Sequence, residues 1–262
     1  MKTKIGFFLF LSIVLASCSS DNPAPENEDF FPLTTGNSWT YEVIGQTSSF
    51  DNLSIGAEII IQNKTYKKIE VTEFPAGFYA TFLNQNGLRK ENGKLLFAGN
   101  LNLNLGIDLP LSIALSNFVL VDGQADNNNE LSSQSNSISQ DFNGFPITID
   151  STIKSTALES LPSFTTSQNE TYSNVKKVTF ALNIKVVTVQ TIPGTSITIP
   201  ITLLNNQDVI LATHYYAENI GMVYGNTVIS YTLAIDPSVF DLDIPQSGSQ
   251  TQEEFLDSYN LN

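Results

Sequence analysis

The sequence predicts an all-β fold, an antiparallel and strongly curved sheet of about 10–14 strands that forms an open barrel or a sandwich. Three observations support this prediction. Apolar residues alternate with polar residues through most of the chain, and turn-forming dipeptides separate the alternating stretches. Before the last residues, no stretch shows the period of an amphipathic helix.

The longest alternating stretch covers residues 101–115. Leucine or isoleucine occupies eight successive odd positions there, with polar, small or proline residues between them. A strand places such residues on one face, whereas a helix would scatter them around its circumference. At about 3.3 Å per residue the stretch would be roughly 50 Å long, which exceeds an ordinary strand. We therefore expect it to bend, or to break into a hairpin near residues 106–108 or at Pro110, because proline cannot donate to a strand ladder.

The first half of the domain contains five shorter candidate strands. They cover residues 39–43, 58–61, 65–72, 78–83 and 95–97. A turn at residues 62–64 joins the second strand to the third. Asn86-Gly87 and Asn92-Gly93 predict two further tight turns, because Asn-Gly readily adopts the positive φ angles that tight hairpins need.

The second half continues the same pattern. Its candidate strands cover residues 118–121, 145–149, 178–186, 197–203, 209–216, 221–224 and 227–235, with turns at Asn143-Gly144, Pro193-Gly194 and Gly225-Asn226. Residues 122–140 are rich in Asn, Ser and Gln and form either a long exposed loop or, in part, a solvated strand. Residues 245–262 are a polar tail. The spacing of a capping box at residues 251–254 predicts a short helix or a frayed end there.

The first 18 residues have the layout of a secretory signal. Two lysines precede a mostly apolar stretch at residues 5–14, and small residues then lead into Cys18. The apolar stretch is much shorter than the roughly 20 residues that span a bilayer. Leu15-Ala16-Ser17-Cys18 resembles the lipobox of bacterial lipoproteins. That resemblance implies a signal peptide at residues 1–17 that is cleaved before Cys18, and lipid attachment (diacylglyceryl on sulfur, then acylation of the new amino terminus, typically as palmitate) at Cys18.

Residues 18–29 are polar, acidic and proline-containing, so they predict a flexible tether. The folded β-domain is then expected at residues 30–244. Ser19 follows the cysteine directly, where many inner-membrane lipoproteins of Gram-negative bacteria carry aspartate. By the same resemblance, we expect the protein to be anchored in the outer membrane, on its periplasmic face or at the cell surface.

Composition excludes several function classes. The chain has 12 basic and 26 acidic residues, a net charge of -14, and loss of Lys2 and Lys4 with the signal would make it -16. Such a surface repels phosphates and anionic lipid headgroups, so neither nucleic acid nor a membrane surface, apart from the lipid anchor, is an expected partner. Cys18 is the single cysteine, which leaves no internal disulfide, no cysteine nucleophile and no cysteine-based zinc site.

No group of residues predicts catalysis. His214 is the single histidine, lies in a candidate strand and has no Gly-x-Ser-x-Gly partner motif, so we interpret it as structural. Two acidic groups lack the Gly and Glu spacing of an EF-hand; they are Asp122, Asp126 and Glu130, and Asp236, Asp241 and Asp243. We therefore predict no catalytic residue, no metal site and no cofactor.

Two weaker patterns concern the surface of the domain. Asp150-Ser151-Thr152 resembles the site at which Bacteroidetes glycosylate exported proteins, but a three-residue match often arises by chance, and the alternative is a polar strand end. Seven aromatic residues could form a surface for sugar or lipid, but packing of a β-domain uses the same residue types. These residues are Trp39, Tyr41, Tyr66, Tyr79, Tyr215, Tyr216 and Tyr231.

Segments at both ends of the domain carry a family resemblance. The first reads FPLTTGNSWTY over residues 31–41, the second reads NKTY over residues 63–66, and the last reads YYAENIGMV over residues 215–223. They resemble the opening strand, second hairpin and closing segment of Bacteroidetes lipoproteins of unassigned function. The resemblance implies a β-sheet domain on a lipid tether and transfers no catalytic residues.

These observations favour a non-enzymatic, membrane-anchored lipoprotein whose β-domain binds a ligand or partner in the cell envelope. The alternative is a lipocalin-like or lipoprotein-carrier-like protein, in which the aliphatic face of residues 101–115 lines a cavity for an apolar ligand. A hydrolase is the third hypothesis. The expected partners are the membrane, through the lipid anchor, and an apolar small molecule or an envelope protein. The sequence assigns no ligand-binding residue.

Overall fold

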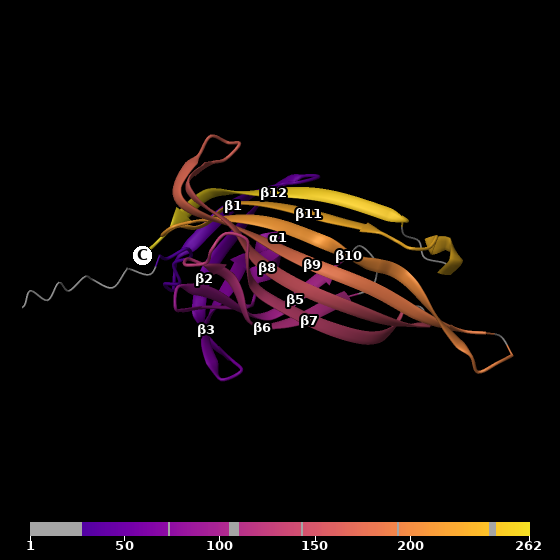
Figure 1. Ribbon diagram of the computed structural model, residues 1–262. Helices are drawn as coiled ribbons and strands as arrows, with labels where there is room; N and C mark the ends of the chain where they lie inside the picture. The colour runs from indigo at the N-terminus through magenta and orange to yellow at the C-terminus, as the bar shows by residue number, and fades with distance from the viewer. Residues whose placement is uncertain (1–27, 73, 105–109, 143, 193, 241–244) are drawn as a thin grey trace, which may run out of the picture.

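A computed structural model of the chain describes residues 28–72, 74–104, 110–142, 144–192, 194–240 and 245–262 (Figure 1). They form one antiparallel sheet of 12 strands that nearly closes into a barrel, which confirms the predicted fold class. The strands are β1 (Ser38–Ile44), β2 (Ser48–Ile61), β3 (Lys64–Thr72), β4 (Gly87–Glu91), β5 (Lys94–Asn104), β6 (Pro110–Asp122), β7 (Asn129–Phe142), β8 (Phe145–Thr165), β9 (Thr171–Thr191), β10 (Thr198–Ala217), β11 (Gly221–Thr232) and β12 (Ser247–Asn260). The described helices are α1 (Phe78–Leu83) and a 3-10 turn, η1 (Pro237–Phe240).

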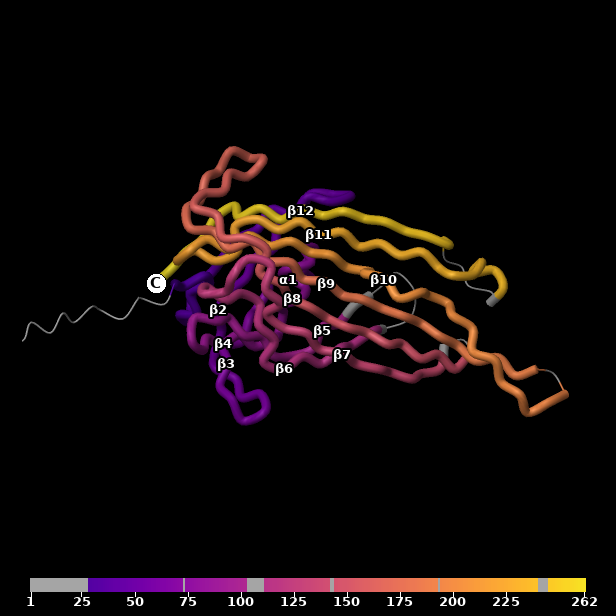
Figure 2. Tube along the Cα trace, in the orientation of Figure 1, coloured from indigo at the N-terminus to yellow at the C-terminus, as the bar shows by residue number. Residues whose placement is uncertain are grey.

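The strands follow one another around the sheet. The spatial order is β6-β5-β4-β3-β2-β1-β12-β11-β10-β9-β8-β7, so consecutive strands pair, except β6 with β7, and β1 also pairs with β12. The turns therefore alternate between two ends of the barrel (Figure 2). We call the end where residue 28 enters and β12 finishes the proximal end. The distal end carries the connections after β1, β3, β5, β7, β9 and β11.

The long leucine stretch breaks into a hairpin, as one of the two expected alternatives. β5 ends at Asn104, β6 begins at Pro110, and Leu101 pairs with Ile113. The connection at residues 105–109 lies outside the described residues. Pro110 opens an edge strand, where its missing N–H leaves no ladder bond unmade.

Two predicted turns are confirmed and two are wrong. Residues 62–63 and Asn92-Gly93 all have positive φ and join consecutive strands. Asn86-Gly87 does not connect two strands, because it follows α1 and Gly87 is the first residue of β4. Gly225-Asn226 lies inside β11, and the preceding turn occurs at residues 218–220. Packing explains this glycine, because a Cβ at Gly225 would lie 3.2 Å from Cδ2 of His214 on the neighbouring strand.

Two local predictions are overturned by tertiary contacts. Residues 78–83, expected as a strand, form α1, which lies inside the barrel with five of its residues buried. The short helix expected near residues 251–256 is instead part of β12, so the folded domain extends well beyond residue 244. That strand gains hydrogen bonds from both β1 and β11, which one exposed helical turn would lack. Residues 129–142 form β7, the solvated-strand alternative.

Helix α1 fills the barrel. Phe82 stacks on Phe97 of β5 with ring centroids 4.4 Å apart and lies 5.1 Å from Phe180 of β9. β5 and β9 lie on either side of the seam in the strand order, so one side chain of α1 contacts both halves of the sheet. The aliphatic face predicted from residues 101–115 also points inward, and Leu101, Leu111 and Ile113 are buried in the same core.

The seam of the barrel lies between β6 and β7, the two strands at the ends of the sheet. Side chains take the place of a ladder there. Gln134 accepts from the Ser116 N–H (3.3 Å) and donates to the Ser116 carbonyl (2.7 Å). The hydroxyl of Ser132 accepts from the Val119 N–H (3.2 Å), and Ser155 of β8 donates to the Val119 carbonyl (2.5 Å).

Replacing Gln134 with leucine is expected to loosen this seam. The change keeps the approximate size of the side chain but removes both bonds to Ser116, at a cost of about 1–3 kcal/mol. Amide hydrogen exchange should accelerate at residues 116–119 and remain unchanged in β1 and β12. The matched control is Gln190→Leu, far from the seam on β9. Equal acceleration in both variants would contradict a local role of Gln134.

Candidate functional site

A polar cluster inside the barrel holds the first turn of α1. The carboxylate of Asp51 on β2 accepts from the N–H groups of Ala76 (2.9 Å) and Gly77 (2.7 Å). Glu254 on β12 accepts from the Tyr79 N–H through both oxygens, at 3.2 and 3.1 Å. Two acidic residues from distant strands thus cap a helix whose own first turn contains no acidic residue.

The neutral partner in this cluster is Gln252. Its side chain accepts from the Phe78 N–H (2.8 Å) and donates to the Ala76 carbonyl (2.8 Å). Burial raises the pKa of Glu254 to about 8, and the charge of nearby Asp51 acts in the same direction. The cluster is therefore a structural cap in which Glu254 holds a proton at neutral pH.

His214 lies on the inner face of β10, next to α1. Its ring centroid is 5.1 Å from that of Tyr79, 6.2 Å from Tyr216 and 6.3 Å from Phe78. Burial lowers the pKa of His214 to about 4, and its Nε2 atom has no hydrogen-bond partner among the described residues. A neutral imidazole packed among aromatic rings fits the structural interpretation made from the sequence.

Sequence reasoning missed Asp51 and Glu254. Asp51 follows Phe50 in a polar stretch, and Glu254 sits in the segment that resembled a capping box. The available signal was weak: each acid occupies an inward position of a strand, where a carboxylate is rare unless it is paired. Only the position of α1 reveals what each carboxylate binds.

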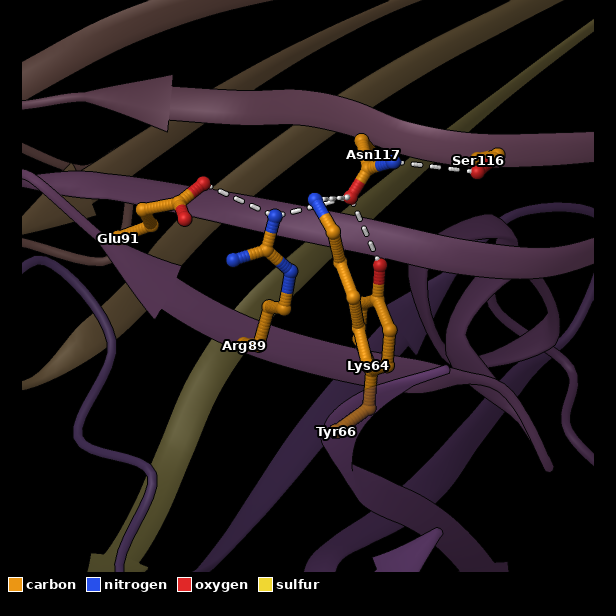
Figure 3. Close-up of polar contacts among 6 residues, drawn as sticks. All are labelled: Lys64, Tyr66, Arg89, Glu91, Ser116 and Asn117. Carbon is orange, nitrogen blue, oxygen red and sulfur yellow. Dashed lines mark hydrogen bonds and ion pairs between the residues drawn. The ribbon is translucent and has the colours of Figure 1, made fainter. Parts of the chain in front are cut away.

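A second polar cluster lies on the sheet near the seam (Figure 3). The side-chain oxygen of Asn117 accepts from Arg89 (2.8 Å), Tyr66 (3.0 Å) and Lys64 (3.3 Å). Arg89 also pairs with Glu91 at 3.0 Å, which lowers the pKa of that carboxyl. Asn117 has a φ of 50° and, with Ser116, lies at the irregularity in the pairing of β6. Side chains of β3 and β4 therefore meet β6 at this irregularity. The arrangement fastens this edge strand to β3 and β4.

The predicted aromatic surface is largely core. Trp39, Tyr41, Tyr66, Tyr79 and Tyr216 are each 2% exposed or less. Packing is thus the main role of the set. Tyr215 and Tyr231 are partly exposed, and Tyr215 stacks on Phe164 at 4.1 Å.

The first and last segments of the family resemblance meet at the proximal end. The indole of Trp39 donates to the Ile220 carbonyl (2.7 Å), and the hydroxyl of Tyr41 donates to the Met222 carbonyl (3.0 Å). Phe31 stacks on Trp39 at 4.6 Å. A Cβ at Gly221 would lie 3.1 Å from Phe31, and its φ of 119° also favours glycine. The two segments form one packed unit that secures the β10–β11 turn.

Ser151 is unsuited to carry a glycan in this fold. Its side chain is 4% exposed and donates to the Asn136 carbonyl at 3.4 Å. Asp150 and Thr152 point the other way along β8, as alternate residues of a strand do. The position of Ser151 therefore favours the strand interpretation of this tripeptide.

Most of the exposed large apolar side chains lie in the distal parts of strands or in distal connections. Eleven described large hydrophobic residues are exposed, and eight of them lie on strand ends or connections that point distally. These eight are Ile44, Phe50, Phe74, Val189, Ile192, Ile197, Ile199 and Val239. The proximal end has Ile60 and Tyr259, and Leu211 lies along β10.

Cys18, the predicted lipid-attachment residue, lies outside the described residues, as do the predicted signal peptide and most of the tether. In the described part of the chain, no helix is long and apolar enough to cross a membrane. The same residues contain no group of three His, Cys, Asp or Glu side chains arranged to hold a metal ion.

No protein-family model and no curated protein matches this sequence. A crystal structure described as a "putative lipoprotein" from Parabacteroides distasonis is similar to 89% of this chain and 99% of its own, at 14% identity and a TM-score of 0.39. A likeness of this size carries no argument about fold or function, so the family resemblance noted in the sequence stays a prediction.

Proposed function

We propose that this protein is a non-enzymatic lipoprotein, anchored through Cys18 in the outer membrane, whose β-domain binds a ligand or partner in the cell envelope. The observation that carries the binding role is that most exposed apolar side chains lie on distal strand ends and connections, on the side away from the root of the tether. Apolar surface that is exposed in this way is typical of interaction sites.

The interior supports an external binding surface. Leu101, Leu111, Ile113 and Leu115 expose 3% or less of their surface, so protein atoms already cover the described part of this aliphatic face. The polar groups beneath α1 bind the helix itself. The distal surface, by contrast, has Phe74 at 99% exposure and Val239 at 72%.

Photo-crosslinking in cells that produce the protein tests this proposal. A photoreactive amino acid at Phe74 should give adducts with a partner or ligand, whereas the same amino acid at Ile60, 77% exposed at the proximal end, should give few. Cys18→Ala should release the protein from the membrane fraction or leave it unprocessed. Equal adducts at both positions, or membrane retention of Cys18→Ala, would contradict the distal surface or the anchor respectively.

The apolar-carrier alternative rests on a different observation. The described inner face of the β5–β6 hairpin is apolar throughout, and the seam beside it is fastened at Ser116 and Val119 of β6. If the strands part distally, an acyl chain could enter. Mass spectrometry of molecules released from the purified protein tests this: co-purified lipid supports a carrier, and a stably empty protein that binds no lipid probe contradicts it.

A further inference from the structure

The hairpin between β9 and β10 extends beyond the rest of the barrel. The last pair between β8 and β9 is Ile147 with Thr188, whereas β9 and β10 stay paired as far as Thr191 with Thr198. Beyond Thr188 the two strands therefore form a free hairpin, which projects from the distal end in Figures 1 and 2. Both of its faces are open.

The composition of this hairpin differs from that of the chain. Residues 186–207 contain no Asp, Glu, Lys or Arg, although 12 basic and 26 acidic residues occur among 262. Four of its side chains are exposed large hydrophobics: Val189 (41%), Ile192 (37%), Ile197 (57%) and Ile199 (47%). Exposed apolar side chains on an uncharged, isolated hairpin do not help to keep the protein in solution. Their exposure therefore indicates contact with an apolar environment.

The exposed apolar residues occupy both faces of the hairpin. Val189 pairs with Pro200, and Ile192 lies near Ile197 and Ile199 on the other face, because paired residues share a face and successive residues alternate. A groove on a protein partner would cover one face and leave the other in water. The boundary between lipid headgroups and acyl chains surrounds an inserted tip on both sides.

We infer that the β9–β10 hairpin inserts its tip shallowly into a bilayer surface. The absence of basic residues means that the hairpin requires no anionic lipid, and the net charge of -14 opposes one, so the expected surface is zwitterionic. Insertion stays shallow because the outer edges of an isolated hairpin carry unpaired backbone groups, which cannot enter the hydrocarbon core without cost.

This inference rests on the proposed function, since it names the apolar environment that part of the distal surface meets. The two can fail separately. Protein adducts at Phe74 without any vesicle binding would leave the proposed function standing and remove the lipid role of the hairpin.

Vesicle flotation tests the inference on a chain that begins at Ser19. The core starts at Phe30 and all 12 strands follow it, so this chain contains the whole described fold without the lipid or signal. It should float with phosphatidylcholine vesicles, and neither 0.5 M salt nor added anionic lipid should strengthen binding. Ile192→Ser with Ile197→Ser should reduce the bound fraction at least fivefold. The matched control Ile60→Ser, at the exposed proximal end of β2, should leave it unchanged.

A fluorescent label gives a second readout that does not depend on bulk affinity. The chain from Ser19 has no cysteine, so Ile197→Cys and Ile60→Cys each provide one labelling site. An environment-sensitive dye at Ile197→Cys should shift its emission to the blue with vesicles, and the same dye at Ile60→Cys should not. The inference would be overturned if the chain did not float, or if Ile60→Ser reduced binding as much as the hairpin variant. It would also be overturned if unlabelled protein, added in place of vesicles, caused the shift at Ile197→Cys, because a second copy of the chain would then be the occupant.

Discussion

Gly77→Ala is expected to destabilise the fold by about 3 kcal/mol or more, which corresponds to a fall in melting temperature of about 6–12 °C for a domain of this size. A Cβ at Gly77 would lie 2.1 Å from Oε1 of Glu254 and 2.9 Å from Oδ2 of Asp51. Neither side chain can withdraw without breaking its bonds to the backbone of Ala76, Gly77 or Tyr79. The backbone at Gly77 has a φ of -79°, which any residue adopts, so the effect is steric.

Thermal and urea unfolding of Gly77→Ala and Gly45→Ala measure this effect. Gly45 is the control because the nearest atoms to its added Cβ lie 3.9 Å away, at ordinary contact distance. Its substitution should change stability by less than about 1 kcal/mol. A wild-type melting temperature for Gly77→Ala would mean that α1 does not rest on the two carboxylates.

Glu254→Gln is expected to remove the loss of stability that the wild-type protein suffers between pH 6.5 and pH 8. Glu254 has a folded-state pKa of about 8, raised by burial, against an ordinary value of 4.5. Its favourable contribution is therefore complete below pH 4.5 and is lost as pH rises through 8, with a slope of up to about 1.4 kcal/mol per pH unit.

His214 contributes with the opposite sign. Burial lowers its folded-state pKa to about 4 from 6.5, so its contribution is complete above pH 6.5 and is lost as pH falls through 4. The two effects oppose each other between pH 4.5 and pH 6.5. Above pH 6.5 the titration of Glu254 acts without opposition from His214, and the wild type should lose up to about 2 kcal/mol by pH 8.

Urea unfolding at pH 6.5, 7.2 and 8 separates these profiles. The Gln side chain keeps an oxygen for the Tyr79 N–H and has no proton to lose, so the Glu254→Gln profile should be nearly flat. The control Glu253→Gln lies on the same strand, where the Glu253 carboxylate accepts from the Tyr224 hydroxyl (2.5 Å), and it should keep the wild-type slope. A wild-type slope in Glu254→Gln would show that another group titrates in this window.

The sheet could be predicted from the sequence because strand formation here follows a local, repeated pattern. Leu101 to Leu115 alternates without a break, and only a strand places such residues on one face. The turn at Asn92-Gly93 is also local, since its two residues supply the positive φ angles themselves. Such features are complete within a few neighbouring residues.

The contents of the barrel interior could not be predicted, because they depend on contacts between residues that are far apart in the chain. Residues 78–83 are apolar almost throughout, and a short segment buried on all sides shows neither a helical nor a strand period. The acceptors that hold its amino-terminal end come from Asp51 and Glu254, which lie 26 and 177 residues away from Gly77 in the chain. The helix expected at residues 251–256 was wrong for a similar reason, because these residues pair with β1, which lies near the other end of the chain.

By itself, the sequence determined that this is a twisted antiparallel all-β domain, and it supplied Cys18 as the predicted anchor, because both signals are local. The tertiary structure alone decided that α1 enters the barrel, that Glu254 stays protonated beneath it, and that most exposed apolar residues lie on distal strand ends and connections. Each of these depends on side chains brought together from strands far apart in the chain. Hydrophobic periodicity records which face of a strand is buried, but not what that face meets.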